Sequence, residues 1–343
     1  MSRFRQYTSL ATGVLDRIVR PRVSRVTFLI TYDCNQRCKT CDIWQVNKRN
    51  PGLREQEITL EEFTQFCQYN DLLWISLCGG EPFIRADIGE ILRTALNSVK
   101  LVSITTNGSN TDTILSSVEY ALRKSKGSTL AVNVSFNGGE EVHNGISGVE
   151  DSYRRALQTF SGLQKIKTSR LKAGISYTTS ALNLGKFPDF VEGMGKDFPG
   201  LEGLTYGIGQ EADLYQWQKG RRIVPGKDSV KTFIDSICRD FKKGVSPLNW
   251  INYKYLDLLR NGKALPKCVA GDYTLLIDPY WKVYPCMFLC PNTPVGDLRE
   301  AEFNISKLDH SRCKEAVRKC GKCPSWTPCE AYNIIVFRPW RVF

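Results

Sequence analysis

Short apolar runs, rich in β-branched and aromatic residues, alternate with longer amphipathic stretches through the first two thirds of the chain. Runs of this kind predict β-strands, here over residues 25–32, 72–77, 101–106, 129–136, 171–179 and 201–207. The stretches between them predict α-helices, among them residues 59–69, 88–98, 111–124, 152–165 and 187–196. Six strand–helix units in succession predict an α/β fold whose parallel sheet curves into a partial (β/α)6 TIM-like barrel.

Two details of this pattern help to place function. Thr59 and Glu62 have the spacing of a capping box, which starts the helix predicted at residues 59–69. In barrels of parallel strands, ligand chemistry lies at the carboxyl ends of the strands. We therefore expect functional residues in the loops that directly follow each strand.

The beginning of the chain is basic. Its first 25 residues hold six arginines and one acid, Asp16, and their apolar residues fall on one face of a helix that Pro21 ends. This segment is interpreted as a docked first helix with a solvated basic face, or as an arm that binds a membrane surface or an acidic partner. A transit peptide has the same composition.

Composition narrows the class of protein. The chain has 343 residues, 42% of them hydrophobic and 24% charged, which indicates a globular protein of about two domains. Its formal net charge of +12 is compatible with nucleic acid, an anionic membrane surface or an acidic substrate. No stretch approaches the roughly 18 apolar residues of a membrane span. We expect a cytoplasmic protein, with peripheral attachment to a membrane as an open alternative.

Thirteen cysteines, an odd number in a chain without a secretory signal, argue against a disulfide framework and for bound iron or zinc. Cys34, Cys38 and Cys41 directly follow the first strand with the spacing C-x3-C-x2-C. Three thiolates do not complete a tetrahedral zinc site. They can hold three irons of a [4Fe–4S] cluster and leave the fourth iron open. A zinc knuckle that takes a fourth ligand from elsewhere is the alternative.

The turn after the second strand carries a second candidate site. It reads Gly79-Gly80-Glu81-Pro82. Two glycines allow the backbone to approach a ligand closely, and a carboxylate can pair with an ammonium group. By itself this is a weak turn motif.

Together, the cysteine triad and these turns resemble the radical S-adenosylmethionine (radical SAM) superfamily. In that family the open iron chelates the amino and carboxylate groups of the cofactor. The turns after the third, fourth and fifth strands are similar to the family motifs T-N-G, S-L-D-G and T-x-x-x-N, although Asn137 replaces the usual Asp and Thr40 replaces an aromatic residue. The resemblance implies a set of cofactor-binding residues: Gly79, Gly80, Glu81, Pro82, Asn107, Ser135 and Asn183.

The resemblance also implies a mechanism. One electron, from a donor such as flavodoxin or ferredoxin, reduces the cluster, and S-adenosylmethionine is cleaved to a 5′-deoxyadenosyl radical that abstracts a substrate hydrogen atom. The cofactor supplies this chemistry, while the protein positions atoms and excludes water. No catalytic acid or base is assigned by sequence, and His143 is interpreted as structural.

Residues 266–343 hold seven cysteines and include a C-x2-C pair followed by a third cysteine, which is a strong metal-binding signal. The segment resembles the SPASM and twitch extensions of radical SAM enzymes, which hold auxiliary Fe–S clusters. Trp281 stands where a hairpin glycine is usual, so we expect a differently built turn, and Asn333 stands where a further cysteine is usual. The resemblance implies at least one auxiliary [4Fe–4S] cluster, with ligands from Cys268, Cys286, Cys320, Cys323 and Cys329.

The tail has two alternative interpretations, and the remaining cysteines are not expected to bind metal. A structural zinc ribbon is the alternative for the tail, and a second cluster would need Cys290 or Cys313. Cys67, Cys78 and Cys238 are expected to be small buried residues. The predicted organisation is a basic arm (1–24), a radical SAM partial barrel (25–215), a helical linker (216–265) and an auxiliary-cluster domain (266–343).

The substrate is the least determined point. Relatives that mature peptides often carry a peptide-binding domain before the barrel, and about 24 residues precede the first strand here. We therefore expect a small-molecule, sugar or lipid-linked substrate, anionic or membrane-associated, with peptide or protein modification as the alternative. A zinc-stabilised nucleic-acid-binding protein is the alternative of another class. Bound clusters would lower the net charge to roughly +9, so nucleic acid is not the expected partner.

Overall fold

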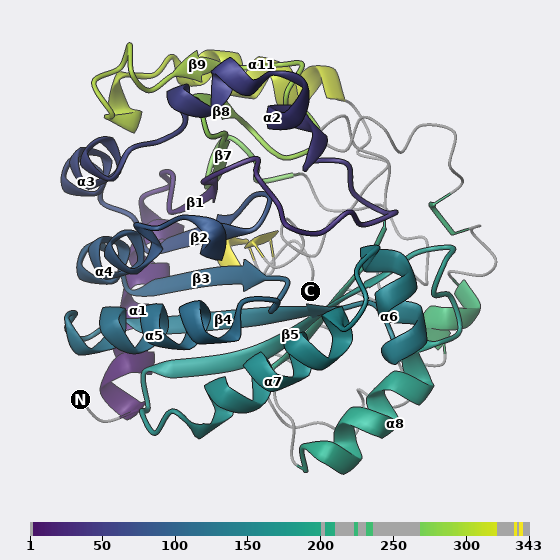
Figure 1. The fold of residues 1–343 in the computed structure, drawn as a ribbon. Coiled ribbons are helices and arrows are strands. Elements are labelled where there is room, and N and C mark those ends of the chain that lie inside the picture. Colours follow the sequence, from purple (N-terminus) through teal and green to yellow (C-terminus); the bar gives the residue numbers. More distant parts are fainter. Residues whose placement is uncertain are drawn as a thin grey trace.

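The structure is a computed structural model that describes residues 3–199, 203–209, 223–225, 231–235, 268–320, 333–334 and 336–338. Within these residues, nine strands form one sheet in the order β6-β5-β4-β3-β2-β1-β7-β8-β9 (Figure 1). The strands are β1 (Arg25–Leu29), β2 (Trp74–Cys78), β3 (Leu101–Thr106), β4 (Thr129–Phe136), β5 (Leu171–Thr179), β6 (Leu204–Ile208), β7 (Thr274–Ile277), β8 (Lys282–Tyr284) and β9 (Gly296–Asp297).

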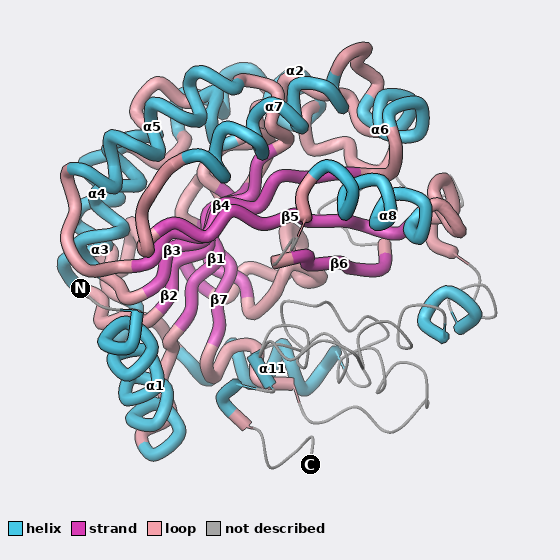
Figure 2. Tube along the Cα trace, turned by 90° about the horizontal axis from the view of Figure 1, so that it is seen from below, coloured by secondary structure: helices cyan, strands magenta, loops and turns pink. Residues whose placement is uncertain are grey.

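Strands β1 to β6 are all parallel, which confirms the predicted α/β fold. Helices lie along the outer face of the curved sheet (Figure 2). Those of the barrel are α2 (Gln45–Arg49), α3 (Leu60–Tyr69), α4 (Ile88–Ser98), α5 (Thr111–Arg123), α6 (Glu140–Ser147), α7 (Ser152–Lys165) and α8 (Phe187–Asp197), with 3-10 turns η1 (Pro51–Gln56) and η2 (Pro82–Ile84). The sheet is open among the described residues, because β6 and β9 are its two edges.

The two faces of the sheet differ in chemistry. The helix-facing side chains are apolar, and the ring of Phe28 packs edge-on against Phe63 and Phe66 of α3, with centroids 5.3 and 4.9 Å apart. On the opposite face, Thr27, Ser76 and Ser103 are register neighbours on β1, β2 and β3. Successive side chains of a strand alternate between faces, so these three small polar side chains lie on the inner face of the barrel.

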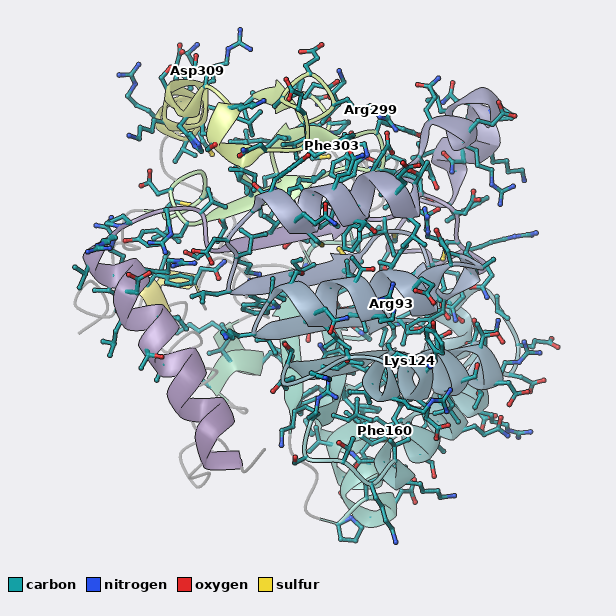
Figure 3. All side chains as sticks on the ribbon, turned by 90° about the vertical axis from the view of Figure 1, so that its left-hand side faces the viewer. Arg93, Lys124, Phe160, Arg299, Phe303 and Asp309 are labelled. Atoms are coloured by element: carbon teal, nitrogen blue, oxygen red, sulfur yellow. The ribbon has the colours of Figure 1, made fainter. Side chains whose placement is uncertain are left out.

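The helical layer shows the expected division between core and solvent. In Figure 3, Arg93 lies on α4 and Lys124 directly follows α5, in the helical layer that covers the sheet. Lys124 is exposed, whereas Phe160 of α7 is fully buried. The predicted capping box is also present. Glu62 N donates to Thr59 Oγ1 at 3.2 Å, and Thr59 N donates to Glu62 Oε2 at 3.0 Å.

The tail extends the barrel sheet. Strand β7 pairs in parallel with β1, and β8 and β9 continue the sheet in antiparallel order, followed by η4 (Ile305–Lys307) and α11 (His310–Cys320). The segments on the two sides of the predicted boundary at residue 266 therefore contribute strands to one and the same sheet. Most of the predicted linker, residues 216–265, lies outside the described residues.

The turn at Trp281 corrects an expectation. Trp281 has φ +66°, the left-handed conformation that glycine favours, so the hairpin keeps this backbone geometry without the glycine. The side chain is fully buried. Its ring packs edge-on against Phe28 and Phe303, with centroids 5.7 and 5.0 Å apart, and these contacts hold the strained residue in place.

Helix α1 (Arg3–Val19) docks near the amino-terminal ends of the strands. Arg17 is 3% exposed and forms ion pairs with Asp16 at 2.6 Å and Asp71 at 2.9 Å. Arg22 pairs with the same two carboxylates. Two of the six arginines of the basic segment, Arg17 and Arg22, are thus paired within the protein, which leaves fewer of them to bind a membrane surface. None of the described helices is long and apolar enough to cross a membrane.

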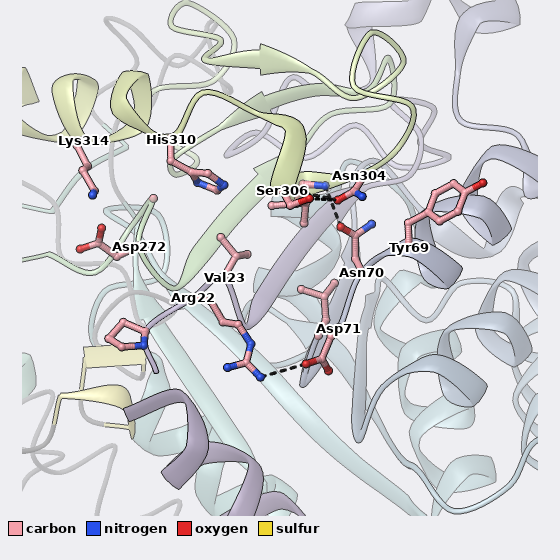
Figure 4. A pocket seen from close by; sticks show the side chains of 14 residues that line it. Arg22, Val23, Tyr69, Asn70, Asp71, Asp272, Asn304, Ser306, His310 and Lys314 are labelled. Atoms are coloured by element: carbon pink, nitrogen blue, oxygen red, sulfur yellow. Dashed lines mark hydrogen bonds and ion pairs between the residues drawn. The ribbon is translucent and has the colours of Figure 1, made fainter. Parts of the chain in front are cut away.

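A pocket of about 380 Å³ lies beside this helix (Figure 4). Arg22, Asp71, Asp272 and His310 are among its lining residues, and Arg22 is paired with Asp71 across it. Its residues from the barrel precede β1 and β2, so it opens at the amino-terminal end of the strands. The candidate cofactor residues lie at the other end.

Candidate functional site

The cysteine loop follows β1 at the carboxyl end of the sheet. Its backbone is held by the end of α6, because Arg37 N donates to Ser147 O at 3.0 Å and Lys39 N donates to Ile146 O at 2.8 Å. Gly148, with φ +69°, ends that helix directly against Arg37. Helix α6 was missed in the sequence, and it is one of the two supports of this loop.

The three thiols of the loop are half-buried and electrostatically coupled to one another. Burial raises the pKa of Cys34 to about 11 and that of Cys41 to about 12, and it also raises the pKa of Cys38. The thiols are therefore protonated at neutral pH without iron, and metal binding must displace these protons.

Among the described residues, no three His, Cys, Asp or Glu side chains are arranged to hold one metal ion. In a [4Fe–4S] cluster each thiolate binds a different iron, so its ligand sulfurs stand farther apart than the sulfurs around a single ion. Cys34, Cys38 and Cys41 lie in one loop, and the neighbouring thiols Cys41 and Cys34 add to the effect of burial in raising the pKa of Cys38.

The glycines of the second turn form the other support of the cysteine loop. Gly80 N donates to Thr31 O at 2.8 Å, and Glu81 N donates to Asp33 O at 2.8 Å. A Cβ atom on Gly79 would overlap Thr31 O, and one on Gly80 would overlap Asp33 O. These glycines thus allow a close approach to the backbone that leads into Cys34.

Glu81 is a buried carboxylate at the start of η2, next to buried Pro82. Its side chain is surrounded by donors: Oε1 accepts from Thr106 Oγ1 at 2.7 Å and from Phe83 N at 3.1 Å, and Oε2 accepts from Asn107 N at 2.7 Å. Burial raises its pKa to about 7. No ion pair among the described residues includes Glu81. A buried carboxylate without a cation favours a positively charged ligand.

Asn107 joins this carboxylate to the cysteine loop. Besides the bond from its backbone to Glu81, its Nδ2 donates to Asn35 Oδ1 at 2.8 Å and lies 3.9 Å from Cys34 Sγ. Thr106 and Asn35 were not selected from the sequence, although Thr106 belongs to the same Thr-Asn-Gly turn. The Thr106-Asn107 turn thus contacts both the Glu81 carboxylate and the cysteine loop.

Ser135 and Asn183 differ in their surroundings. Ser135 is half-buried on β4 and lies opposite Ser176 of β5. Asn183 is 1% exposed, and both protons of its amide are used, because Nδ2 donates to Asn137 O and Thr178 O at 2.9 Å. The amide of Asn183 therefore ties the end of β5 to the loop after β4.

His143 has the structural role expected of it. Its Nδ1 accepts from Asn137 N at 3.2 Å, and its ring lies 5.7 Å from that of Phe136. Burial lowers its pKa to about 4, so the imidazole is neutral at physiological pH.

The tail cysteines fall into two sets of neighbours. Cys290 is fully buried, coupled to Cys286 and Cys78, and accepts a hydrogen bond from the Tyr32 hydroxyl. Cys78, expected to be a small core residue, is half-buried and lies in the same apolar cluster as Cys290. These contacts place Cys286 and Cys290 against the carboxyl end of β2.

The second set lies around α11. Cys313 is buried beside Gly271, and Cys268 accepts a hydrogen bond from Ala270 N at 3.4 Å. Cys320 ends α11, whereas Cys323, Cys329 and Cys238 lie outside the described residues. Cys67 is buried in the main core, as expected.

Comparison with protein families gives one match. Residues 28–179 match the model described as the Radical SAM superfamily. This region begins in β1 and ends with β5, so it includes the cysteine loop, the turn at Glu81 and the turn at Asn107.

Two curated proteins are similar over 89% of the chain. Mycofactocin maturase MftC of Mycobacterium ulcerans (strain Agy99) is 24% identical over 337 residues, which cover 81% of its length. The antilisterial bacteriocin subtilosin biosynthesis protein AlbA of Bacillus subtilis (strain 168) is 22% identical over 327 residues, which cover 66% of its length.

Two solved structures share the fold. Streptococcus suis SuiB bound to S-adenosylmethionine superposes with a TM-score of 0.62 at 15% identity, over 88% of this chain and 71% of that chain. Native anSMEcpe with bound AdoMet and Cp18Cys peptide superposes with a TM-score of 0.62 at 14% identity, over 94% of this chain and 98% of that chain.

Proposed function

We propose that this chain, a radical SAM enzyme, modifies a peptide or protein substrate. Its cofactors are a [4Fe–4S] cluster, S-adenosylmethionine and at least one auxiliary [4Fe–4S] cluster. When bound, the first cluster and S-adenosylmethionine supply the one-electron chemistry that removes a hydrogen atom from the substrate. The protein residues hold these groups, orient them and exclude water.

The residues of the site fit these groups. Three coupled thiols in one loop, Cys34, Cys38 and Cys41, would hold the first cluster. Glu81 would accept a hydrogen bond from the amino group of S-adenosylmethionine, because it is a buried carboxylate with three donors and no ion pair among the described residues. Asn107 would fix the position of the S-adenosylmethionine site relative to the cluster site, since it contacts both Glu81 and the cysteine loop.

The auxiliary site would take its ligands from the tail. Cys268, Cys286, Cys320, Cys323 and Cys329 are the proposed set. The position of Cys290 beside Cys286 makes it a further candidate, and this neighbourhood lies against β2 of the barrel. An electron donor such as flavodoxin or ferredoxin would reduce the clusters.

The observation that carries the substrate class is the match along almost the whole chain to a maturase, MftC. AlbA is a bacteriocin biosynthesis protein, and SuiB has been crystallised with its precursor peptide SuiA. The anSMEcpe chain that holds a peptide is covered to 98% by this protein. A barrel and tail of this size can therefore accompany peptide binding, so the shortness of the segment before β1 does not favour a small molecule.

The experiment that tests the substrate class follows hydrogen transfer. Extracts from cells grown in D2O are divided into a peptide fraction and a small-molecule fraction, and each is incubated anaerobically with the reconstituted enzyme, reductant and S-adenosylmethionine. Mass spectrometry of 5′-deoxyadenosine should show deuterium with the peptide fraction. Protease treatment of that fraction should abolish the signal.

Two controls make the result decisive. Cys34→Ala should give no deuterated product with either fraction, because the first cluster cannot form. Deuterium transfer from the small-molecule fraction alone would replace the peptide assignment with a sugar, lipid-linked or other small substrate.

A further inference from the structure

Gln36 occupies an unusual position between the first two cysteines of the loop. Its side chain is only 3% exposed, although a glutamine side chain is usually solvated. Its backbone N–H donates to the thiol of Cys34, and its side-chain amide lies beside Cys38. Gln36 therefore contacts two of the three proposed cluster ligands.

The two polar atoms of this amide are not equally satisfied. Oε1 accepts a hydrogen bond from Cys38 Sγ at 3.5 Å. Nε2 is buried and has no hydrogen-bond partner among the described residues. A buried donor without a partner costs about 1–3 kcal/mol, so its presence beside a cofactor site needs an explanation.

Cluster binding changes what the sulfur can do. A thiol donates a proton to Oε1, but an iron-bound thiolate has no proton and can only accept. Oε1 would then face a negatively charged sulfur. A half-turn of the amide about its last side-chain bond exchanges the two atoms, turning an N–H toward Cys38.

We propose that the side-chain amide of Gln36 donates an N–H···S hydrogen bond to the thiolate of Cys38 in the cluster-bound enzyme and thereby raises the reduction potential of the first cluster. The reduced cluster carries one more negative charge than the oxidised one, so it gains more from the bond. Hydrogen bonds to the sulfurs are one of the factors that set Fe–S potentials. Gln36 is thus a positioning residue that acts through Cys38.

The inference rests on the proposed first cluster but not on the identity of the substrate. Its test is the midpoint potential of that cluster, measured anaerobically by EPR-monitored redox titration of the reconstituted protein without substrate. Gln36→Met removes the donor without changing charge. Its potential should be more negative by roughly the 59 mV that corresponds to a tenfold change in a one-electron equilibrium.

Gln45 provides a matched control from the same region. Its Nε2 already donates to Asp42 Oδ1 at 3.2 Å, and its Oε1 accepts from Arg49 at 2.8 Å. Gln45→Met is the same chemical change at an amide whose atoms are both used. It should leave the potential at its wild-type value.

A Gln36→Met protein with full iron and sulfide content and the wild-type potential would overturn the inference. A second measurement uses the wild-type chain with 15N in the glutamine side-chain amides. Pulsed EPR of the reduced first cluster should detect coupling to one such nitrogen, retained in Gln45→Met. Absence of this coupling overturns the inference even where Gln36→Met fails to assemble its cluster. Absence of the first cluster from wild-type protein would instead contradict the proposed function.

Discussion

Trp281 Nε1 donates a hydrogen bond to Oε2 of Glu62 at 3.0 Å, joining the tail hairpin to the first turn of α3. Glu62 also caps that helix and pairs with Arg299 at 2.7 Å. The left-handed backbone of Trp281 costs about 1–2 kcal/mol. Burial of an aromatic side chain, about 150–250 Å² at ~25 cal/mol per Å², offsets this strain. The barrel and the tail therefore share one core at this junction.

This junction should contribute strongly to stability. Trp281→Ala should lower the free energy of unfolding by about 3–5 kcal/mol, because it leaves a cavity in the shared core. Trp281→Phe keeps an aromatic ring but removes the N–H and part of the ring volume, so it should cost more than the about 1 kcal/mol of the lost hydrogen bond and less than Trp281→Ala. Anaerobic urea denaturation followed by circular dichroism measures both, with exposed Tyr69→Phe as the control. Equal stability of Trp281→Ala and the control would show that the junction is unimportant.

Binding of S-adenosylmethionine should depend on pH through Glu81. Because burial raises the pKa of this carboxyl to about 7, its charged form is lost as the pH falls below that value. Affinity should then decrease by about tenfold per pH unit, since the amino group of S-adenosylmethionine loses its charged hydrogen-bond acceptor. Glu81→Gln should weaken binding about 10- to 150-fold at pH 8, the equivalent of about 1.5–3 kcal/mol, and should remove the pH dependence. Equilibrium dialysis under nitrogen measures both, and a pH-independent wild type would contradict the role of Glu81.

Glu81 should also make the free energy of unfolding depend on pH, but this free energy should fall as the pH rises, whereas the affinity for S-adenosylmethionine should increase. The raised pKa means that folded protein without S-adenosylmethionine binds more protons than unfolded protein between about pH 4.5 and about pH 7. The contribution of Glu81 to stability therefore falls as pH rises through this window. The difference in unfolding free energy between wild type and Glu81→Gln, measured at several pH values, should follow this slope. A constant difference would argue against a shifted carboxyl.

Gly80 should be intolerant of a side chain. Gly80→Ala places a methyl group against Asp33 O, so the turn at Glu81 and the cysteine loop cannot both keep their positions. We expect loss of the first cluster and of S-adenosylmethionine cleavage, measured by iron content and chromatography. Gly139→Ala is the matched control, because nothing lies within 4 Å of its Cβ position. Normal cleavage by Gly80→Ala would show that the close packing is dispensable.

The cysteine triad should account for one cluster. Cys34→Ala, Cys38→Ala or Cys41→Ala should each lower the iron content by about four atoms per chain and leave the auxiliary iron in place. Cys67→Ala, in the main core, should keep all the iron. Iron and sulfide assays on anaerobically reconstituted proteins decide this. A loss of all iron in the triad variants would mean that the two sites do not form independently.

Much of the fold could be predicted because its signals are local. Apolar runs at strand length, helical periodicity and the Thr59–Glu62 capping box all lie within a few neighbouring residues. Helix α6 was missed because it is short and contains Gly145, which weakens a helical pattern. The turn at Trp281 was expected to differ because tryptophan stands where glycine is usual. The contacts that stabilise its positive φ come from distant residues such as Phe303 and leave no local signal.

The sequence by itself determined the order of strands and helices, the C-x3-C-x2-C spacing and the turns that follow the strands. Tertiary structure decided what these groups contact. The packing of strands and loops brings Asn107 between Glu81 and Cys34, places Gly80 against Asp33, and sets Cys290 beside Cys78. Such contacts join residues far apart in the chain, and they depend on how elements pack rather than on any local pattern.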